Sequence, residues 1–321
     1  MAVHLQTTEV VAVVTTYEAG SPRLLTIGDP GGVPALPAGP LLADHRSLQA
    51  GLRAWVESQT GLRLGFVEQL YTFADRERAG AHQRVISVSY VGLTRPTALP
   101  SGQAHWRDWY ELLPWEDRRT PAGDALVAGL RSALDEWANG ADVPAVAGAR
   151  RARLRMAFGA DDRAWRAEDC LHRYELLWEA GLLPESRAVP GAAVPGAAHE
   201  DSAPAAGGAT GTGTAMRHDH RRIAATGMAR LRSKIQYRPV VFELLPDAFT
   251  LGQLQQVVEA LSGTRLHKQN FRRLVEAEEL VEETGESTTA TGGRPARLMR
   301  FRADALFDRP GAGLRLPQPR R

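Results

Sequence analysis

Two short helices near the C-terminal end constrain the fold of this chain most strongly. Thr250 and Gln253 form a capping box, in which each side chain accepts a hydrogen bond from the other residue's backbone N–H, so a helix begins there. Gly263 suits the left-handed position just past a helix end. A second helix is expected to begin near His267, after a turn of a few residues. The first helix carries its apolar residues on one face: Leu251, Leu254, Val258 and Leu261.

The second helix has a basic face. Phe271, Leu274 and Val275 can face inward, which leaves Lys268, Gln269, Arg272 and Arg273 facing out. Such side chains carry the donors that base edges and phosphates accept in a DNA major groove. The alternative is a solvated basic face, and Arg273 could instead pair with an acidic neighbour such as Glu276. Helix-turn-helix spacing alone is a weak signal.

A loop between two strand-like runs strengthens that signal. The segment Thr284–Pro295 separates Glu279–Val281 from Ala296–Arg302, and Gly293 and Pro295 fix the loop that presents Arg294. The whole stretch therefore predicts a winged helix-turn-helix. Arg294 is expected to contact phosphate or the minor groove.

The charge is divided unequally between the two parts of the chain. Residues 216–321 hold nineteen Lys and Arg against twelve Asp and Glu, whereas the whole chain holds 39 and 37. A basic C-terminal part is thus joined to an acidic N-terminal one. This is the electrostatic pattern expected of a domain that binds the phosphate backbone. The alternative partners of a basic face are an acidic protein or a membrane.

Length and composition set the outer limits. A chain of 321 residues is long enough for two or three domains, and its 43% hydrophobic and 24% charged residues are typical of a soluble protein. We expect a cytoplasmic protein, because there is no long apolar run and no signal-peptide pattern. Cys170 is the only cysteine, and with His172 it makes two ligand-type residues, too few for a zinc site. No cofactor is predicted.

The N-terminal part alternates strand and helix patterns. Ser47 is a suitable N-cap and Gly61 a suitable C-terminal stop for a helix over Ser47–Gln59. A second amphipathic helix is expected over Asp124–Trp137. The expected strands are Glu9–Tyr17, Pro22–Ile27, Val67–Phe73, Arg84–Leu93 and His105–Leu113.

Part of this region resembles a Nudix box. The loop Leu36-Pro37-Ala38-Gly39, the helix and the exit Thr60-Gly61-Leu62 match the frame of that motif. The catalytic carboxylates do not match. Ala54-Trp55 stands in place of Arg-Glu, Ser58-Gln59 in place of Glu-Glu, and His45 or Arg46 in place of the earlier Glu.

A Nudix hydrolase needs several carboxylates on one helix to hold Mg²⁺, which prefers oxygen ligands. Without them we expect no metal site, no catalytic residue and no hydrolysis. The domain is therefore predicted to be a catalytically degenerate Nudix-like fold that still binds a ligand. Trp55 is expected to be a packing residue.

Further motifs resemble the NrtR type of Nudix-related transcriptional regulators. They include Val67–Phe73, Arg84–Tyr90 and Ala229–Tyr237, and the helix pair and Gly-Arg-Pro loop described above. The resemblance implies a Nudix-like domain that senses a nucleotide such as ADP-ribose. It also implies a winged helix that binds an inverted-repeat operator as a homodimer and represses genes of NAD metabolism. Ligand-phosphate candidates are Arg76, Arg78 and Arg84.

The predicted fold class is α+β multidomain, an α/β/α Nudix-like sandwich followed by a helical extension and a winged helix-turn-helix. Residues 1–140 form the ligand-sensing domain and 141–185 the helical extension, with helices over Arg150–Phe158 and Arg163–Leu183. Residues 186–215 form an Ala/Gly/Pro linker, 216–305 the DNA-binding domain and 306–321 a tail. Within the helix over 218–236, Arg230, Arg232 and Lys234 are equally suited to phosphate contacts and to ion pairs.

Two rival functions remain. One is a divergent Nudix hydrolase acting on ADP-ribose or dinucleotide pyrophosphates through Glu57 and outlying carboxylates. The other is a protein-interaction adaptor, which would be favoured if the C-terminal part bound no DNA at low salt.

Overall fold

The computed structural model describes residues 7–29, 31–65, 67–74, 85–100, 102–159, 163–187, 211–289, 295–302, 304 and 313–314. Its main feature is a mixed sheet in which the strand order is β4-β5-β1-β2-β6 and β3 pairs with β1. β1 runs parallel to β5 and antiparallel to β2, and β2 runs antiparallel to β6. The strands are β1 (Thr7–Glu18), β2 (Ser21–Ile27), β3 (Ala38–Pro40), β4 (Val67–Phe73), β5 (Val85–Leu93) and β6 (Ala104–Asp108).

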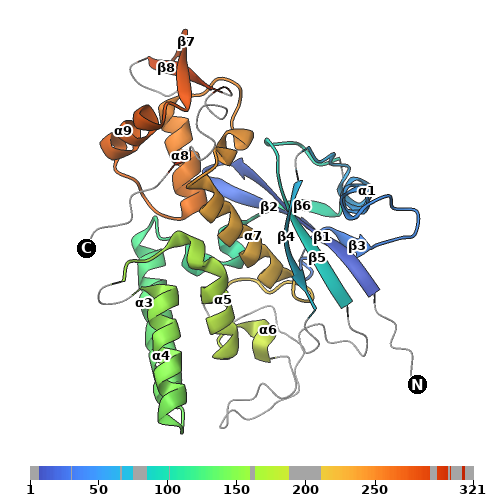
Figure 1. Cartoon of the computed structure of the whole chain (residues 1–321), viewed down its shortest axis with the longest axis vertical. Helices are drawn as coiled ribbons and strands as arrows, with labels where there is room; N and C mark the ends of the chain where they lie inside the picture. The colour runs from blue at the N-terminus through green and yellow to red at the C-terminus, as the bar shows by residue number, and fades with distance from the viewer. Residues whose placement is uncertain are drawn as a thin grey trace.

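Both faces of this sheet are covered. Val10, Ala12 and Val14 of β1 pack with α1 (Leu48–Thr60) on one face, whereas Val11 and Val13 belong to a second core on the other face. Strand residues alternate between faces, so the continuous apolar run of β1 requires a helix layer on each side. Figure 1 shows α1 and α7 on opposite sides of the sheet.

α7 (His220–Ile235) forms the second layer. It contacts β1, β4 and β5, and a Cβ added at Gly227 would come within 2.6 Å of Val13 Cγ1. The helix therefore approaches β1 more closely than any larger residue would allow. This differs from the expectation that residues 216–305 form one DNA-binding unit, since α7 packs as a helix of the sandwich.

Short and long helices connect β6 to α7. They are α2 (Trp109–Leu112), the 3-10 turn η1 (Pro114–Glu116), α3 (Pro121–Asn139), α4 (Pro144–Phe158), η2 (Ala167–Asp169), α5 (Cys170–Glu179) and α6 (Pro184–Arg187). The strand expected over His105–Leu113 is wrong in its second half. β6 stops at Asp108, because the Asp108 side chain accepts a hydrogen bond from Tyr110 N (2.8 Å) and caps α2.

The single helix expected over Arg163–Leu183 is also wrong, since α5 begins only at Cys170. Gly159, at φ 66°, ends α4. The carbonyl oxygens of Arg166 and Ala167 accept hydrogen bonds from the Arg173 guanidinium (2.9 and 3.1 Å), and Arg166 O also accepts the 3-10 bond from Asp169 N (3.2 Å).

The C-terminal part is a winged helix that shares the core of the second sheet face. Its elements are η3 (Val240–Leu244), α8 (Leu251–Ser262), α9 (Lys268–Glu278), β7 (Val281–Thr288) and β8 (Ala296–Phe301). It lies at the end of the molecule opposite α4 (Figure 1). Among the described residues, no helix combines the length and the apolar character that crossing a membrane requires.

Candidate nucleic-acid interface and its link to the sheet

The helix pair has the local geometry that its sequence predicts. Thr250 Oγ1 accepts from Gln253 N (3.1 Å), and Gln253 Oε1 accepts from Thr250 N (2.7 Å). Gly263 ends α8 at φ 70°. The turn to α9 is fixed by Glu259, whose Oε1 accepts from Leu266 N (2.9 Å). The orientation of α9 therefore depends on side chains of α8.

α9 turns its basic face to solvent. Phe271 and Val275 are each 1% exposed and hold the helix on the core. The exposed side chains are Lys268, Gln269, Arg272 and Arg273. Among the described residues, none of these four side chains has an intramolecular hydrogen bond or ion pair. The face is thus free to contact a partner.

The wing is longer than expected. β7 continues to Thr288, well beyond the predicted run Glu279–Val281, and pairs antiparallel with β8. Arg300 Nε lies 2.6 Å from Glu282 Oε1, and Arg297 also pairs with Glu283 across the hairpin. Arg294 lies outside the described residues.

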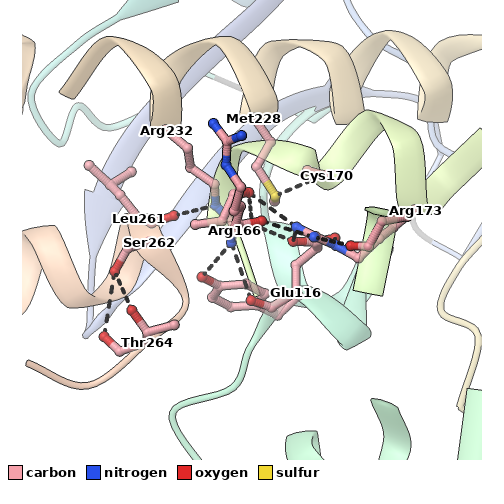
Figure 2. Close-up of polar contacts among 12 residues, drawn as sticks. Glu116, Arg166, Cys170, Arg173, Met228, Arg232, Leu261, Ser262 and Thr264 are labelled. Carbon is pink, nitrogen blue, oxygen red and sulfur yellow. Dashed lines mark hydrogen bonds and ion pairs between the residues drawn. The ribbon is translucent and has the colours of Figure 1, made fainter. Parts of the chain in front are cut away.

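A buried carboxylate joins the winged helix to the sandwich. Glu116, at the end of η1, is 1% exposed and faces two arginines, Arg173 of α5 and Arg232 of α7. Arg173 donates to both carboxylate oxygens (2.6 and 2.9 Å), and Arg232 donates to Oε2. Figure 2 shows the two guanidinium groups converging on this carboxylate from different helices. We call Glu116, Arg173 and Arg232 the buried hub.

The hub contacts the end of α8 directly. Arg232 Nε donates to Leu261 O (2.8 Å), and Tyr110 Oη donates to Ala260 O. Arg118 N also donates to Gly263 O (2.7 Å). A Cβ at Gly263 would lie 2.0 Å from the carbonyl oxygen of Glu116, so only glycine fits between α8 and the hub. The position of the helix-turn-helix is thus set by the segment Tyr110–Arg118.

The charges of the hub stabilise one another. Burial by itself raises the pKa of Glu116, but Arg173 and Arg232 more than offset it and hold this pKa below its usual range. Glu116 also raises the pKa of Arg232, against the effect of burial. Glu116 and Arg232 are therefore both charged at neutral pH. Sequence reasoning missed Glu116, because its partners lie 57 and 116 positions further along the chain.

α7 is not a phosphate-binding helix along its inner face. Arg232 is 3% and Lys234 is 8% exposed. Lys234 is paired with Glu68 of β4. The sequence alone allows either phosphate contacts or ion pairs for Arg230, Arg232 and Lys234. The structure shows ion pairs inside the protein for Arg232 and Lys234. Arg230 is exposed.

At the position of the predicted Nudix-like box, side chains of α1 contact the β3 loop. Trp55 Nε1 donates to Pro40 O (2.9 Å), and a Cβ at Gly39 would come within 2.3 Å of the Trp55 ring. Gln59 bonds both the N–H (3.2 Å) and the C=O (2.8 Å) of Ala38. Glu57 pairs with Arg63 at the surface (2.7 Å). Trp55 and Gln59 therefore bind the helix to the β3 loop.

In the part of the chain that is described, no group of three or more potential metal-ligating side chains occurs. The ligand-phosphate candidates Arg76, Arg78 and Arg84 lie outside the described residues.

These features define a class: a Nudix-like sandwich joined to a winged helix-turn-helix. Residues 241–301 match the NrtR DNA-binding winged helix domain. This match begins after α7, consistent with the packing of α7 on the sheet.

Solved structures share the whole architecture. A crystal structure of Shewanella oneidensis NrtR complexed with a 27mer DNA aligns over 97% of this chain and 99% of its own, with 19% identity and a TM-score of 0.56. A MutT/nudix family protein from Enterococcus faecalis aligns over 94% of this chain and 88% of its own, with 16% identity and a TM-score of 0.52. These likenesses confirm the predicted α+β fold class.

One relative has a higher sequence identity over a shorter alignment. It is the ADPR responsive transcriptional repressor NtrR of Acinetobacter baylyi, 41% identical over 83 residues. The alignment covers 26% of this chain and only 33% of that relative. The family match thus places residues 241–301 with the NrtR winged helix domains, and the solved structures show the same two-part fold over nearly the whole chain.

Proposed function

We propose that this protein is a DNA-binding transcriptional repressor of genes of NAD or nucleotide metabolism, controlled by a nucleotide effector such as ADP-ribose. The observation that carries the proposal is the exposed basic face of α9, the second helix of a winged helix-turn-helix, which has no partner among the described residues. The Acinetobacter relative is named as an ADPR responsive repressor, and the Shewanella structure contains DNA. Both names support the assignment.

In this proposal, α9 enters the major groove. In the N-terminal half of α9, Lys268, Gln269 and Arg272 contact base edges and phosphates. Arg273 contacts the DNA backbone beside them. Arg294 in the wing contacts phosphate or the minor groove. Two copies bind an inverted repeat as a homodimer, since a two-fold symmetric operator matches a two-fold symmetric protein.

The effector binds the Nudix-like domain without being hydrolysed, with Arg76, Arg78 and Arg84 toward its phosphates. Hydrolysis would need the carboxylate cluster that holds Mg²⁺. Trp55 and Gln59 stand at two of those positions and are engaged with Pro40 and Ala38. The direct check is incubation of ADP-ribose with the protein and Mg²⁺ or Mn²⁺. Release of AMP would favour the alternative function, a divergent Nudix hydrolase.

The binding proposal is tested by a mobility-shift titration with DNA upstream of the protein's own gene and its neighbours, at physiological salt. Lys268→Ala and Arg272→Ala should each weaken specific binding by about 1–3 kcal/mol, the range for a base-reading contact. Arg155→Ala is the matched control, because Arg155 is an exposed arginine of α4, which is not part of the winged helix. Unchanged affinity in both α9 variants would refute the role of this helix.

ADP-ribose added to the same titration tests the effector. A weaker shift supports control by this nucleotide. A shift indifferent to it leaves DNA binding in place and rejects ADP-ribose as the effector.

A further inference from the structure

A cleft separates the winged helix from the edge of the sandwich. It encloses about 480 Å³, within the range of small-molecule sites. One wall comes from Leu93 and Arg95, at and just after the end of β5, and from Lys234 and Arg238, at and just after the end of α7. The opposite wall comes from η3, the segment before α8, and β8. A ligand in this cleft would contact both parts of the protein.

The apolar wall of the cleft is aromatic. Phe242 of η3 stacks on Phe301 of β8, with ring centroids 4.5 Å apart and an interplanar angle of 24°. Phe249 also packs against Phe242, with ring centroids 5.5 Å apart. Phe301 is half-buried, so part of this stacked pair borders the cleft. Such a wall suits a flat ring better than a flexible aliphatic chain.

The polar groups at the rim favour an anion. Four cations line the cleft, Arg95, Lys234, Arg238 and Arg300, against two carboxylates, Glu243 and Asp247. Three of the cations have carboxylate partners: Asp247 for Arg95 (2.5 Å), Glu68 for Lys234 and Glu282 for Arg300 (2.6 Å).

Arg238 differs from the other three. It is exposed, and its guanidinium has no partner among the residues that the structure describes. A planar guanidinium with free donors matches a phosphate group, which accepts two parallel N–H bonds. The exposed carboxylate of Glu243 lies on the same rim and can accept bonds from ligand hydroxyl groups.

We propose that this cleft is a binding site for a small nucleotide, with the phosphate on Arg238, the base against the Phe242–Phe301 pair and the ribose hydroxyls toward Glu243. The volume limits the ligand to about the size of a mononucleotide. The cleft does not include α1, so it is separate from the Nudix-box region. The proposal concerns binding only and stands whether or not the chain binds DNA.

One connection across the cleft is weak enough to allow entry. Arg95 Nη2 lies 2.5 Å from Asp247 Oδ1, which ties the end of β5 to the loop before α8. The two side chains are 52% and 90% exposed. An ion pair so exposed contributes little to stability, so a ligand can displace it at low cost.

The test uses the full-length protein at low salt and measures binding of AMP, adenosine and inorganic phosphate by isothermal titration calorimetry. AMP should bind at least tenfold more tightly than adenosine or phosphate. Arg238→Glu should weaken AMP binding at least tenfold, whereas Arg238→Lys should keep part of it. Arg230→Glu is the matched control, since Arg230 is an exposed arginine of α7 that does not line the cleft, and it should change AMP binding less than twofold.

Three results would overturn the proposal. Equal AMP affinity in wild type and Arg238→Glu would place the nucleotide elsewhere. Phosphate binding as tight as AMP binding would mean that the aromatic wall contributes nothing. Absence of AMP binding at millimolar concentration would leave the cleft without this ligand class. Operator binding, measured separately by mobility shift, distinguishes each of these from failure of the proposed DNA-binding function.

Discussion

Replacing Glu116 by Gln is the sharpest test of how the winged helix is held. Glu116 has a fully buried carboxylate and accepts from Arg173 and Arg232 through both oxygens. The amide keeps the shape but removes the charge, which leaves two buried guanidinium groups without a counter-charge. Removing one partner of a buried ion pair costs about 3–5 kcal/mol of the free energy of unfolding. Urea titrations at neutral pH should show a loss of this size.

Glu111→Gln is the matched control. Glu111 lies in α2, just before η1, but its side chain is 55% exposed, and it lies 4.0 Å from Arg107. An exposed pair contributes less than about 1 kcal/mol, so this variant should unfold almost as wild type does. If Glu116→Gln also lost less than about 1 kcal/mol, the buried hub would not be a net stabilising element.

The same variant separates DNA contact from positioning. Arg232 uses its Nε to hold Leu261 O at the end of α8. With residue 116 neutral, Arg232 keeps its bonds to Ala167 O and to the backbone carbonyl of residue 116 but loses its charged partner at Nη1, so α8 and α9 should be held less firmly. We expect weaker operator binding, measured by fluorescence anisotropy, although every side chain of α9 is intact. Unchanged affinity in a folded Glu116→Gln protein would refute this positioning role.

Two further predictions concern the sandwich. His220 is buried and accepts from Leu36 N at Nδ1 (2.9 Å), and burial lowers its pKa to about 3 from an ordinary 6.5. The unfolded chain therefore binds a proton below pH 6.5 that the folded chain does not, so stability is full above that pH and falls toward pH 3. At pH 5 the free energy of unfolding should be about 2 kcal/mol lower than at neutral pH. In urea titrations at several pH values, His220→Gln should abolish this pH dependence. The control His172→Gln, which changes an exposed histidine, should keep it. Gly39→Ala forces the Trp55 ring to move, because the new Cβ would lie 2.3 Å from it. This variant should lower the free energy of unfolding by about 1–3 kcal/mol. An unchanged melting temperature would contradict the close contact.

The sequence was most informative where the physics is local. The capping box of Thr250 and Gln253, the stop at Gly263 and the N-cap at Ser47 each depend on residues a few positions apart, and each is present in the structure. The outward face of α9 follows from helical periodicity in the same way. These elements are predictable because the partners that stabilise them are neighbours in the chain.

The features that the sequence did not predict depend on residues that lie far apart in the chain. No residue near Arg232 in the sequence indicates that it pairs with Glu116. The sequence therefore fits a basic, phosphate-binding face of α7 as well as it fits buried ion pairs. The small residue Gly227 could have been the signal for packing, because it permits α7 to touch Val13 of β1. The cleft beside Arg238 likewise forms only when β5, α7 and β8 come together.

Tyr110→Phe tests whether the contact between the two parts also carries a signal. Most of the predicted linker, residues 188–210, lies outside the described residues. Among the described residues, Tyr110 joins the two parts: it donates to Ala260 O at the end of α8 and accepts from Arg232 Nη2 (3.5 Å). The phenyl ring keeps the packing and removes only the hydroxyl. If effector binding alters DNA affinity through this contact, the ratio of operator Kd with and without ADP-ribose should move toward one, while each ligand still binds alone. An unchanged ratio in the variant would show that the hydroxyl takes no part in coupling and that this contact is structural only.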